Sequence, residues 1–400
     1  MEELQELTAA QIIAGEKSAI AQTYKRAPMV LSHGQGMTVW DTEGNEYLDF
    51  MAGIAVNALG HADAGVTAAL TEQAGKLMHT SNLFYTAPGV QLAEKLTANS
   101  FADKVFFTNS GTEANEGAIK FSRRFARATG GDTKVEIVAF EHAFHGRTMG
   151  TLALTPKEAY QAPFRPLMPG VVIAPFNDVA ALQIAIGPQT AAVFVEPIQG
   201  EGGIHPATTA FLQALRARCD EVGALLVYDE VQCGLGRTGD LWAHKASGVT
   251  PDIMTLAKPL AGGLPVGAIL MTDRVAQTME VGGHGTTFGG GPLVCDVASH
   301  VFDRISQPTF LQHVQETGGY LKERLEEVNS PHIRDVRGRG LMVGVELDLE
   351  VADVIKRGVQ HGLLLVGSGQ NILRLIPPLI AEKPHVDTFI ERLSSVLVEM

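Results

Sequence analysis

Two side chains that could do chemistry follow short apolar runs in the middle of the chain. Asp229 comes directly after the run Ala224–Tyr228, and Lys258 comes just after Ile253–Leu256. Taken alone, such an aspartate is usually a helix cap or a surface acid, and such a lysine is usually a solvated charge. Ligands of open α/β sheets, however, bind beyond the carboxyl ends of the strands. A partly buried amine with a lowered pKa can act there as a nucleophile, and a carboxylate can stabilise a protonated ring.

A third candidate lies at Ser110-Gly111-Thr112, between a predicted strand and a predicted helix. Backbone N–H groups at a helix N-terminus bind a phosphate dianion, and a glycine lets that group approach closely. Ser110 and Glu113 have the spacing of a capping box, which explains the serine without a ligand but does not require Gly111. A lysine, an acid and a phosphate cradle are needed by a pyridoxal phosphate site, together with a flat partner for the ring and an arginine for the substrate carboxylate.

Two other patterns suggest different chemistry. Residues 234–239, Gly-Leu-Gly-Arg-Thr-Gly, match the G-x-G-x-x-G pattern of nicotinamide dehydrogenases, so an NAD-dependent dehydrogenase is the distant alternative. The match is weak because no apolar strand ending in an acid stands about 20 residues further on. His142 and His145 have no third ligand in register, so we interpret them as ordinary loop histidines and expect no metal.

The elements that must position these groups lie between residues 61 and 287, where short apolar runs alternate with helical periodicity. Runs that are apolar throughout and separated by helices predict a mostly parallel sheet covered on both faces, and hence an α/β fold. The predicted strands are Lys104–Thr108, Glu136–Phe140, Val171–Ala174, Ala191–Val195, Ala224–Tyr228, Ile253–Leu256 and Gly267–Met271.

The two ends of the chain have a different pattern. Residues 1–60 mix a short helix with turn-rich strands. Residues 288–400 have α+β character, with a helix near 309–328 and strands at Leu341–Leu347, Leu363–Val366 and Ile372–Ile376. Neither end is long enough to bury a core alone. We therefore expect 1–60 and 288–400 to form one small domain beside a large cofactor-binding domain of residues 61–287.

Composition limits the partners and the compartment. A formal net charge of −13 over 400 residues disfavours nucleic acid and anionic membrane as partners. No apolar run approaches the ~18 residues that span a bilayer, and the acidic start Met1–Glu6 lacks the features of a signal peptide. Three cysteines far apart in the sequence form no disulfide framework, so a reducing cytoplasm is expected.

Five segments resemble, in the same order, the signature blocks of class III aminotransferases, which are fold-type I pyridoxal phosphate enzymes. The segments are SGTEANE at 110–116, FHGRT at 144–148, VEPIQGEGG at 195–203, DEVQ at 229–232 and AKPLAGGLP at 257–265. The resemblance runs over nearly the whole chain. It implies the fold-type I architecture, pyridoxal 5'-phosphate as the cofactor and amino transfer as the reaction.

The resemblance also implies a role for each matching residue of the cofactor site. Lys258 would form the Schiff base with the cofactor and then move the substrate proton, and Asp229 would pair with the pyridine nitrogen. Thr287 would reach the phosphate of the neighbouring subunit, so a homodimer with shared active sites is expected. The other implied cofactor contacts are Gly111 and Thr112 at the phosphate, Phe144 and Val231 at the ring faces, and Gln232 at the ring hydroxyl.

Two substrates are implied by two arginines. Arg147 would bind the α-carboxylate of the amino donor, and Arg374 would bind that of 2-oxoglutarate. In related ω-aminotransferases a glutamate at the position of Glu201 covers the second arginine while the donor is bound. Tyr24 stands where relatives place a tyrosine that contacts the substrate. An aminomutase is a less favoured hypothesis, because it needs no 2-oxoglutarate site.

Within the class, residues 53–61 and 79–85 look most like acetylornithine aminotransferases. The resemblance implies transfer of the δ-amino group of N-acetylornithine to 2-oxoglutarate by a ping-pong mechanism, as in arginine biosynthesis. Gly53 would leave room for an acyl group where ornithine δ-aminotransferases tend to carry tyrosine, although a turn glycine is an equal explanation. The alternative donors are ornithine, succinylornithine, 4-aminobutyrate and a carrier-bound lysine.

Overall fold

The computed structural model describes residues 7–400. The acidic segment Met1–Glu6, which bears on the expected absence of a signal peptide, lies outside the described residues. Within residues 7–400, every helix is too short or too polar to span a bilayer.

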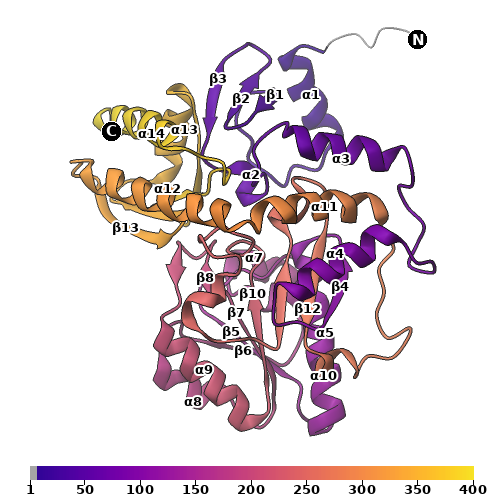
Figure 1. Ribbon diagram of the computed structural model, residues 1–400. Helices are drawn as coiled ribbons and strands as arrows, with labels where there is room; N and C mark the ends of the chain where they lie inside the picture. Colours follow the sequence, from indigo (N-terminus) through magenta and orange to yellow (C-terminus); the bar gives the residue numbers. More distant parts are fainter. Residues whose placement is uncertain (1–6) are drawn as a thin grey trace.

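A seven-stranded sheet occupies the centre of the larger part of the molecule (Figure 1). Neighbouring strands pair in parallel except at β12, which runs antiparallel to β11 and to β4. Every residue of β7, β10, β11 and β12 is buried, which is why these segments are almost entirely apolar. The predicted, mostly parallel sheet is confirmed. In spatial order its strands are β4 (Lys104–Thr108), β12 (Gly267–Met271), β11 (Ile253–Leu256), β10 (Leu225–Asp229), β7 (Thr190–Val195), β5 (Glu136–Phe140) and β6 (Val171–Ala174).

Helices cover both faces of this sheet. On one face lies α5 (Gly111–Gly130), which buries the predicted stripe of Ala114, Ala118, Phe121 and Phe125 against β7, β11 and β12. On the other face lie α8 (Val179–Ala185) and α9 (Thr209–Val222). Helices therefore cover both faces of the central strands, and the polar side chains of the site lie at the strand ends.

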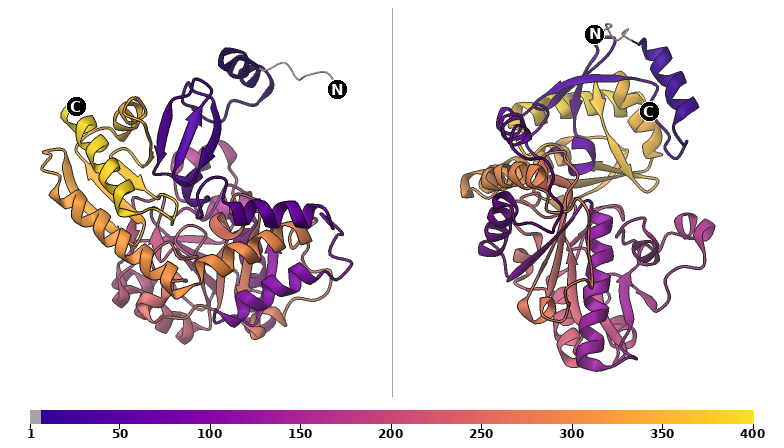
Figure 2. Two further views of the ribbon diagram at one scale, coloured as in Figure 1. Left: turned by 45° about the horizontal axis from the view of Figure 1, so that its top comes forward. Right: turned by 90° about the vertical axis from the view of Figure 1, so that its right-hand side faces the viewer.

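Both ends of the chain contribute to the smaller part of the molecule, which lies above the sheet in Figure 1 and is also visible in both views of Figure 2. Strand β3 (Glu46–Asp49) pairs in parallel with β15 (Leu363–Leu364), more than 300 residues later in the chain. Phe50 stacks on Phe389, with ring centroids 4.0 Å apart. The expected small α+β unit built from both ends is confirmed.

Two four-stranded sheets and several helices make up this smaller part. The first sheet has the order β1 (Leu31–Gln35), β2 (Thr38–Asp41), β3, β15, and the second has β13 (Ile333–Arg339), β14 (Met342–Leu347), β17 (Ile372–Leu375), β16 (Val366–Ser368). The helices are α1 (Ala9–Ala19), α12 (Pro308–Glu327), α13 (Val351–Gln360) and α14 (Lys383–Val398).

The predicted strand Leu363–Val366 is wrong as a single element. Residues 363–364 pair with β3 in the first sheet, whereas β16 begins at Val366 and pairs with β17 in the second. The chain changes partner at Leu365, a change that an apolar run does not reveal.

The remaining elements connect these parts. Helix α11 (Pro292–Ile305) packs against α3 (Ala64–Ala74) and α4 (Ala87–Ala98). The domain limits at residues 60 and 287 stay predictions. The short elements are α2 (Ala52–Ala55), α6 (Met149–Ala153), α7 (Glu158–Gln161), α10 (Asp273–Ala276), β8 (Ile198–Gln199), β9 (His205–Pro206) and the 3₁₀ turns η1 (Ala162–Phe164), η2 (Ala243–Ser247) and η3 (Lys258–Ala261).

Candidate active site

A cavity of about 230 Å³ lies at the carboxyl ends of the parallel strands. Strand β10 ends at Asp229, β11 is followed by Lys258, and α5 begins at Gly111. Asp229 and Thr255 are register partners, so the ends of β10 and β11 lie side by side. Nine of the predicted site residues line this cavity: Gly111, Thr112, Phe144, Arg147, Glu201, Asp229, Val231, Gln232 and Lys258.

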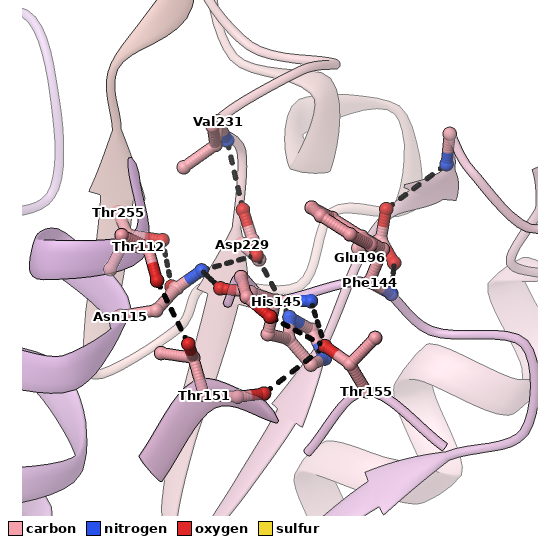
Figure 3. Close-up of polar contacts among 12 residues, drawn as sticks. Thr112, Asn115, Phe144, His145, Thr151, Thr155, Glu196, Asp229, Val231 and Thr255 are labelled. Atoms are coloured by element: carbon pink, nitrogen blue, oxygen red, sulfur yellow. Dashed lines mark hydrogen bonds and ion pairs between the residues drawn. The ribbon is translucent and has the colours of Figure 1, made fainter. Parts of the chain in front are cut away.

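Asp229 is held by three hydrogen bonds on the floor of the cavity (Figure 3). Its Oδ1 accepts from the backbone N–H of Val231 at 3.0 Å. Its Oδ2 accepts from Asn115 Nδ2 at 2.6 Å and lies 2.8 Å from His145 Nδ1. Because a carboxylate oxygen accepts, Nδ1 of His145 carries the proton. The carboxylate is thus fixed in position and partnered by a ring that can carry positive charge.

The interpretation of His145 as an ordinary loop histidine is wrong. Its side chain is fully buried, and burial lowers its pKa, but the hydrogen bond and the negative charge of Asp229 outweigh burial and leave the pKa above its ordinary value. Asn115 is oriented in turn by Thr255, whose hydroxyl donates to Asn115 Oδ1 at 2.7 Å. Sequence reasoning missed this network, although Asn115 and His145 lie inside two of the matched motifs.

Lys258 lies at the first position of η3 and lines the cavity. Burial lowers the pKa of its amine, and the positive charge of Arg374 lowers it further. The carboxylates of Glu201, Asp229 and Glu196 act in the opposite direction without cancelling the effect. Within residues 7–400 the amine has neither a hydrogen-bond partner nor an ion-pair partner, so it is available to react.

Gly111 opens α5 at the wall of the cavity. A Cβ atom added there would lie 2.6 Å from Val231 Cγ1, closer than real Cβ atoms approach. A simple helix cap does not explain this glycine, whereas a close approach to Val231 does. The expected capping box forms only in half: Ser110 accepts from the N–H of Glu113, but Glu113 Oε2 accepts from the N–H of Asn109, at 2.7 Å.

Thr112 lies deeper in the same turn. Its hydroxyl contacts those of Thr148 and Thr151 at 3.1 and 2.8 Å and accepts from the backbone N–H of Arg147 at 3.1 Å. These contacts fasten the loop after β5 to the N-terminus of α5.

Glu196 is a site residue that sequence reasoning did not single out. Its carboxylate accepts from the N–H of Phe144 at 2.9 Å and from the N–H of Gly200 at 3.0 Å. Burial raises its pKa to about 7. Glu196 therefore joins the loop that carries Phe144 to the loop that leads to Glu201.

Arg374 belongs to β17, and its guanidinium group forms an ion pair with Glu201. Its side chain is 1% exposed, and Nη1 lies 2.6 Å from Glu201 Oε1 and 3.2 Å from Gln232 Oε1. The pairing of Arg374 with Glu201 was expected from the sequence. Contact between Arg374 and Gln232 was not expected, and in it the amide oxygen of Gln232 accepts a hydrogen bond from Arg374.

Two of the predicted site residues lie away from the cavity. Tyr24 is 74% exposed and lies beside Arg26. Thr287 is exposed in a loop that Asn82 braces by donating to the carbonyl oxygens of Thr286 and Gly289. Neither residue is brought to Lys258 within the described chain.

The glycine-rich segment 234–239 forms turns and leads into η2, not into a helix that could receive a pyrophosphate. A Cβ atom at Gly236 would lie 2.8 Å from Ile305 Cγ2, so this glycine serves packing. Gly53 has a φ of +61°, which a turn explains, and it lines neither the cavity nor its approach.

Comparisons with known proteins cover nearly the whole chain. The profile of the family Aminotransferase class-III matches residues 19–397. The mitochondrial acetylornithine aminotransferase of Alnus glutinosa is 53% identical, over 97% of this chain and 87% of its own length. The acetylornithine aminotransferase of Methanocaldococcus jannaschii is 47% identical, over 96% of this chain and 97% of its own length.

Solved structures give the same picture. The N-acetylornithine aminotransferase of Stenotrophomonas maltophilia superposes with a TM-score of 0.84 at 38% identity, covering 97% of this chain and 98% of that one. The ornithine aminotransferase of Toxoplasma gondii superposes with a TM-score of 0.95 at 31% identity, covering 99% and 96%.

Proposed function

Because the chain belongs to the class-III aminotransferase family, we propose that it moves the δ-amino group of N-acetylornithine to 2-oxoglutarate. The observation that carries the chemistry is the convergence of Lys258, Asp229 and the Gly111 turn on one cavity. The relatives at 44–53% identity, which are named acetylornithine aminotransferases, support the choice of donor.

The residues of the cavity fit pyridoxal phosphate. Gly111 lines the cavity at the start of α5, where the backbone N–H groups of a helix N-terminus can hold a phosphate dianion. Asp229 offers a fixed carboxylate for a protonated pyridine nitrogen, and the free amine of Lys258 can react with an aldehyde. When bound, this cofactor draws electrons from the substrate carbon that loses its proton.

The chain's own groups would carry the proton and orient the reactants. As a free amine, the Nζ atom of Lys258 would take the proton from the δ-carbon of the donor and deliver it to the cofactor. Phe144 and Val231, which line the cavity, would hold the ring from its two faces. Asp229 would pair with the pyridine nitrogen, because Asn115 and His145 hold its carboxylate in position.

Two arginines would handle the two substrates. Arg147, which is exposed at the rim, would bind the α-carboxylate of the donor. The ion pair between Glu201 and Arg374 would remain formed while the donor is bound. It would break when the α-carboxylate of 2-oxoglutarate displaces the glutamate. The same site could act on another ω-amino donor, and ornithine is the nearest alternative, since ornithine aminotransferases are among the structural neighbours.

We also propose a homodimer whose sites are shared. Thr287 is exposed and does not line the cavity of its own chain, which suits a residue that reaches the phosphate group of the neighbouring subunit. The position of Tyr24, outside the cavity, leaves its substrate contact as a hypothesis that needs movement of the N-terminal segment.

The donor is tested by measuring glutamate formation from 2-oxoglutarate with N-acetylornithine, N-succinylornithine, ornithine and 4-aminobutyrate in parallel. We expect the highest kcat/KM with N-acetylornithine. A higher value with ornithine would keep the chemistry and refute the donor, and no glutamate from any of the four would refute the function.

A further inference from the structure

Arg147 lies over an aromatic ring at the rim of the site. Its guanidinium carbon is 3.5 Å from the centre of the Tyr160 ring and 5.7 Å from that of the Phe144 ring. Tyr160 belongs to the short helix α7, which follows Arg147 in the same surface segment. Nothing in the sequence motifs points to Tyr160.

This arrangement differs from that of the second arginine. Arg374 forms an ion pair with the carboxylate of Glu201, whereas within residues 7–400 no carboxylate lies at ion-pair distance from Arg147. A guanidinium group on a ring face gains cation–π attraction and keeps its in-plane N–H groups for another partner. The ring thus fixes Arg147 without occupying the donors that a carboxylate ligand needs.

Lys157 braces the ring from the preceding turn. Its Nζ lies 3.2 Å from the hydroxyl oxygen of Tyr160 and 4.5 Å from the ring centre. Tyr160 and Lys157 also line a second cavity of about 720 Å³, which shares Phe144 and Glu201 with the cofactor cavity. Arg147, which lines the cofactor cavity, therefore contacts Tyr160, which lines the second cavity, where the two cavities adjoin.

We propose that Tyr160 is a positioning residue that sets the affinity for the donor carboxylate by holding the guanidinium group of Arg147. The acyl end of the donor then lies toward the second cavity, beyond Tyr160. This inference rests on the proposed function, since it takes Arg147 as the site of the donor carboxylate.

The test compares Tyr160→Leu, which removes the ring, with Tyr160→Phe, which keeps the ring and loses only the hydroxyl group. Each variant is assayed with N-acetylornithine and with N-acetylputrescine, which has the same amine and acyl group but no α-carboxylate. With N-acetylornithine, Tyr160→Leu should lower kcat/KM about 3- to 10-fold, mainly through KM, which is the size of one cation–π contact. Tyr160→Phe should stay close to wild type.

With N-acetylputrescine, Tyr160→Leu should match wild type, because Arg147 then has no carboxylate to bind. An equal loss with both donors would overturn the inference, and so would a loss in Tyr160→Phe as large as that in Tyr160→Leu. If the wild type prefers ornithine, the proposed donor fails, and the comparison of ornithine with putrescine still decides the role of Tyr160.

Discussion

An amine must be uncharged to attack a carbonyl carbon, and the surroundings of Lys258 bear on this requirement in both directions. Burial and Arg374 lower its pKa, whereas the carboxylates around it, Glu196 among them, raise it. Glu196 has a pKa of about 7 because of burial, so it is charged only above that pH. The reactivity of the lysine is thus set by burial, by one cation and by nearby carboxylates, of which Glu196 titrates near pH 7.

We expect the apo-protein to capture pyridoxal phosphate covalently at a rate that rises with pH, with a midpoint below the ordinary lysine pKa of 10.5. The rate rises because the neutral amine is the reactive form, and the plateau begins where the lowered pKa has been passed. Glu196→Gln removes a negative charge that holds the proton on the amine, so the midpoint should move to lower pH. A stopped-flow pH series measures both midpoints. A wild-type midpoint at 10.5 or above would contradict this account of Lys258.

At the scale of elements, the site depends on the junction of α5 with the loop after β10. Gly111 at the start of α5 faces Val231 so closely that even a methyl group has no room. The same junction carries Asp229, which Val231 holds through its backbone N–H. A change in the helix start therefore acts on the phosphate cradle and on the acid together.

Gly111→Ala is expected to weaken the binding of pyridoxal phosphate and to destabilise the apo-protein by about 1–3 kcal/mol, the cost of overpacking. Gly319→Ala is the control: Gly319 lies exposed within α12, an added Cβ meets nothing within 4 Å, and alanine should stabilise a helix by about 0.5–1 kcal/mol. Thermal unfolding and a cofactor titration of both variants measure the effects. Wild-type binding by Gly111→Ala would show that the tight contact is not needed.

The elements were predictable where local signals decide them. The strands of the large sheet are apolar runs between turns, and burial on both faces makes such runs recognisable. The strand at 363–366 was not predictable, because it divides at Leu365 between two partners: β3, more than 300 residues earlier in the chain, and β17, which follows β16 directly. Local pattern carries no information on a change of partner.

The site divides in the same way. Lys258, Asp229 and Gly111 were found because each stands at the end of an element and suits a known chemistry. The contacts of Asp229 with Asn115 and His145 join residues that are 114 and 84 positions apart, so spacing could not reveal them. Tyr160 was missed for another reason: its partner Arg147 is close in the chain, but the short helices α6 and α7 and the turn between them set their geometry.

At the scale of the whole molecule, the predicted sharing of sites concerns two chains. Each cavity holds its own Lys258, while Thr287 lies exposed in a loop outside that cavity. If Thr287 completes the phosphate site of the neighbouring chain, a Lys258 defect in one chain and a Thr287 defect in the other fall in the same site and leave the second site intact.

This is tested with a hybrid dimer of one Lys258→Ala chain and one Thr287→Asp chain, isolated through two affinity tags. Each variant alone should be nearly inactive. Lys258→Ala lacks the reactive amine, and the aspartate of Thr287→Asp repels the phosphate group. The hybrid should recover about half of the wild-type activity per dimer, since one of its two sites has both native residues. A hybrid as inactive as its parents would place Thr287 at the site of its own chain, and a monomeric protein would refute the sharing altogether.

The most direct test of the central claim is the visible absorption spectrum of the protein loaded with pyridoxal phosphate, recorded before and after addition of N-acetylornithine alone. The account predicts a visible band that depends on Lys258, disappears with N-acetylornithine and returns when 2-oxoglutarate is added. Absence of the band in Lys258→Ala, under the same loading, would identify the lysine. A protein that shows no such band after loading, or a band that neither N-acetylornithine nor any other ω-amino donor removes, would contradict the assignment of this cavity as an aminotransferase site.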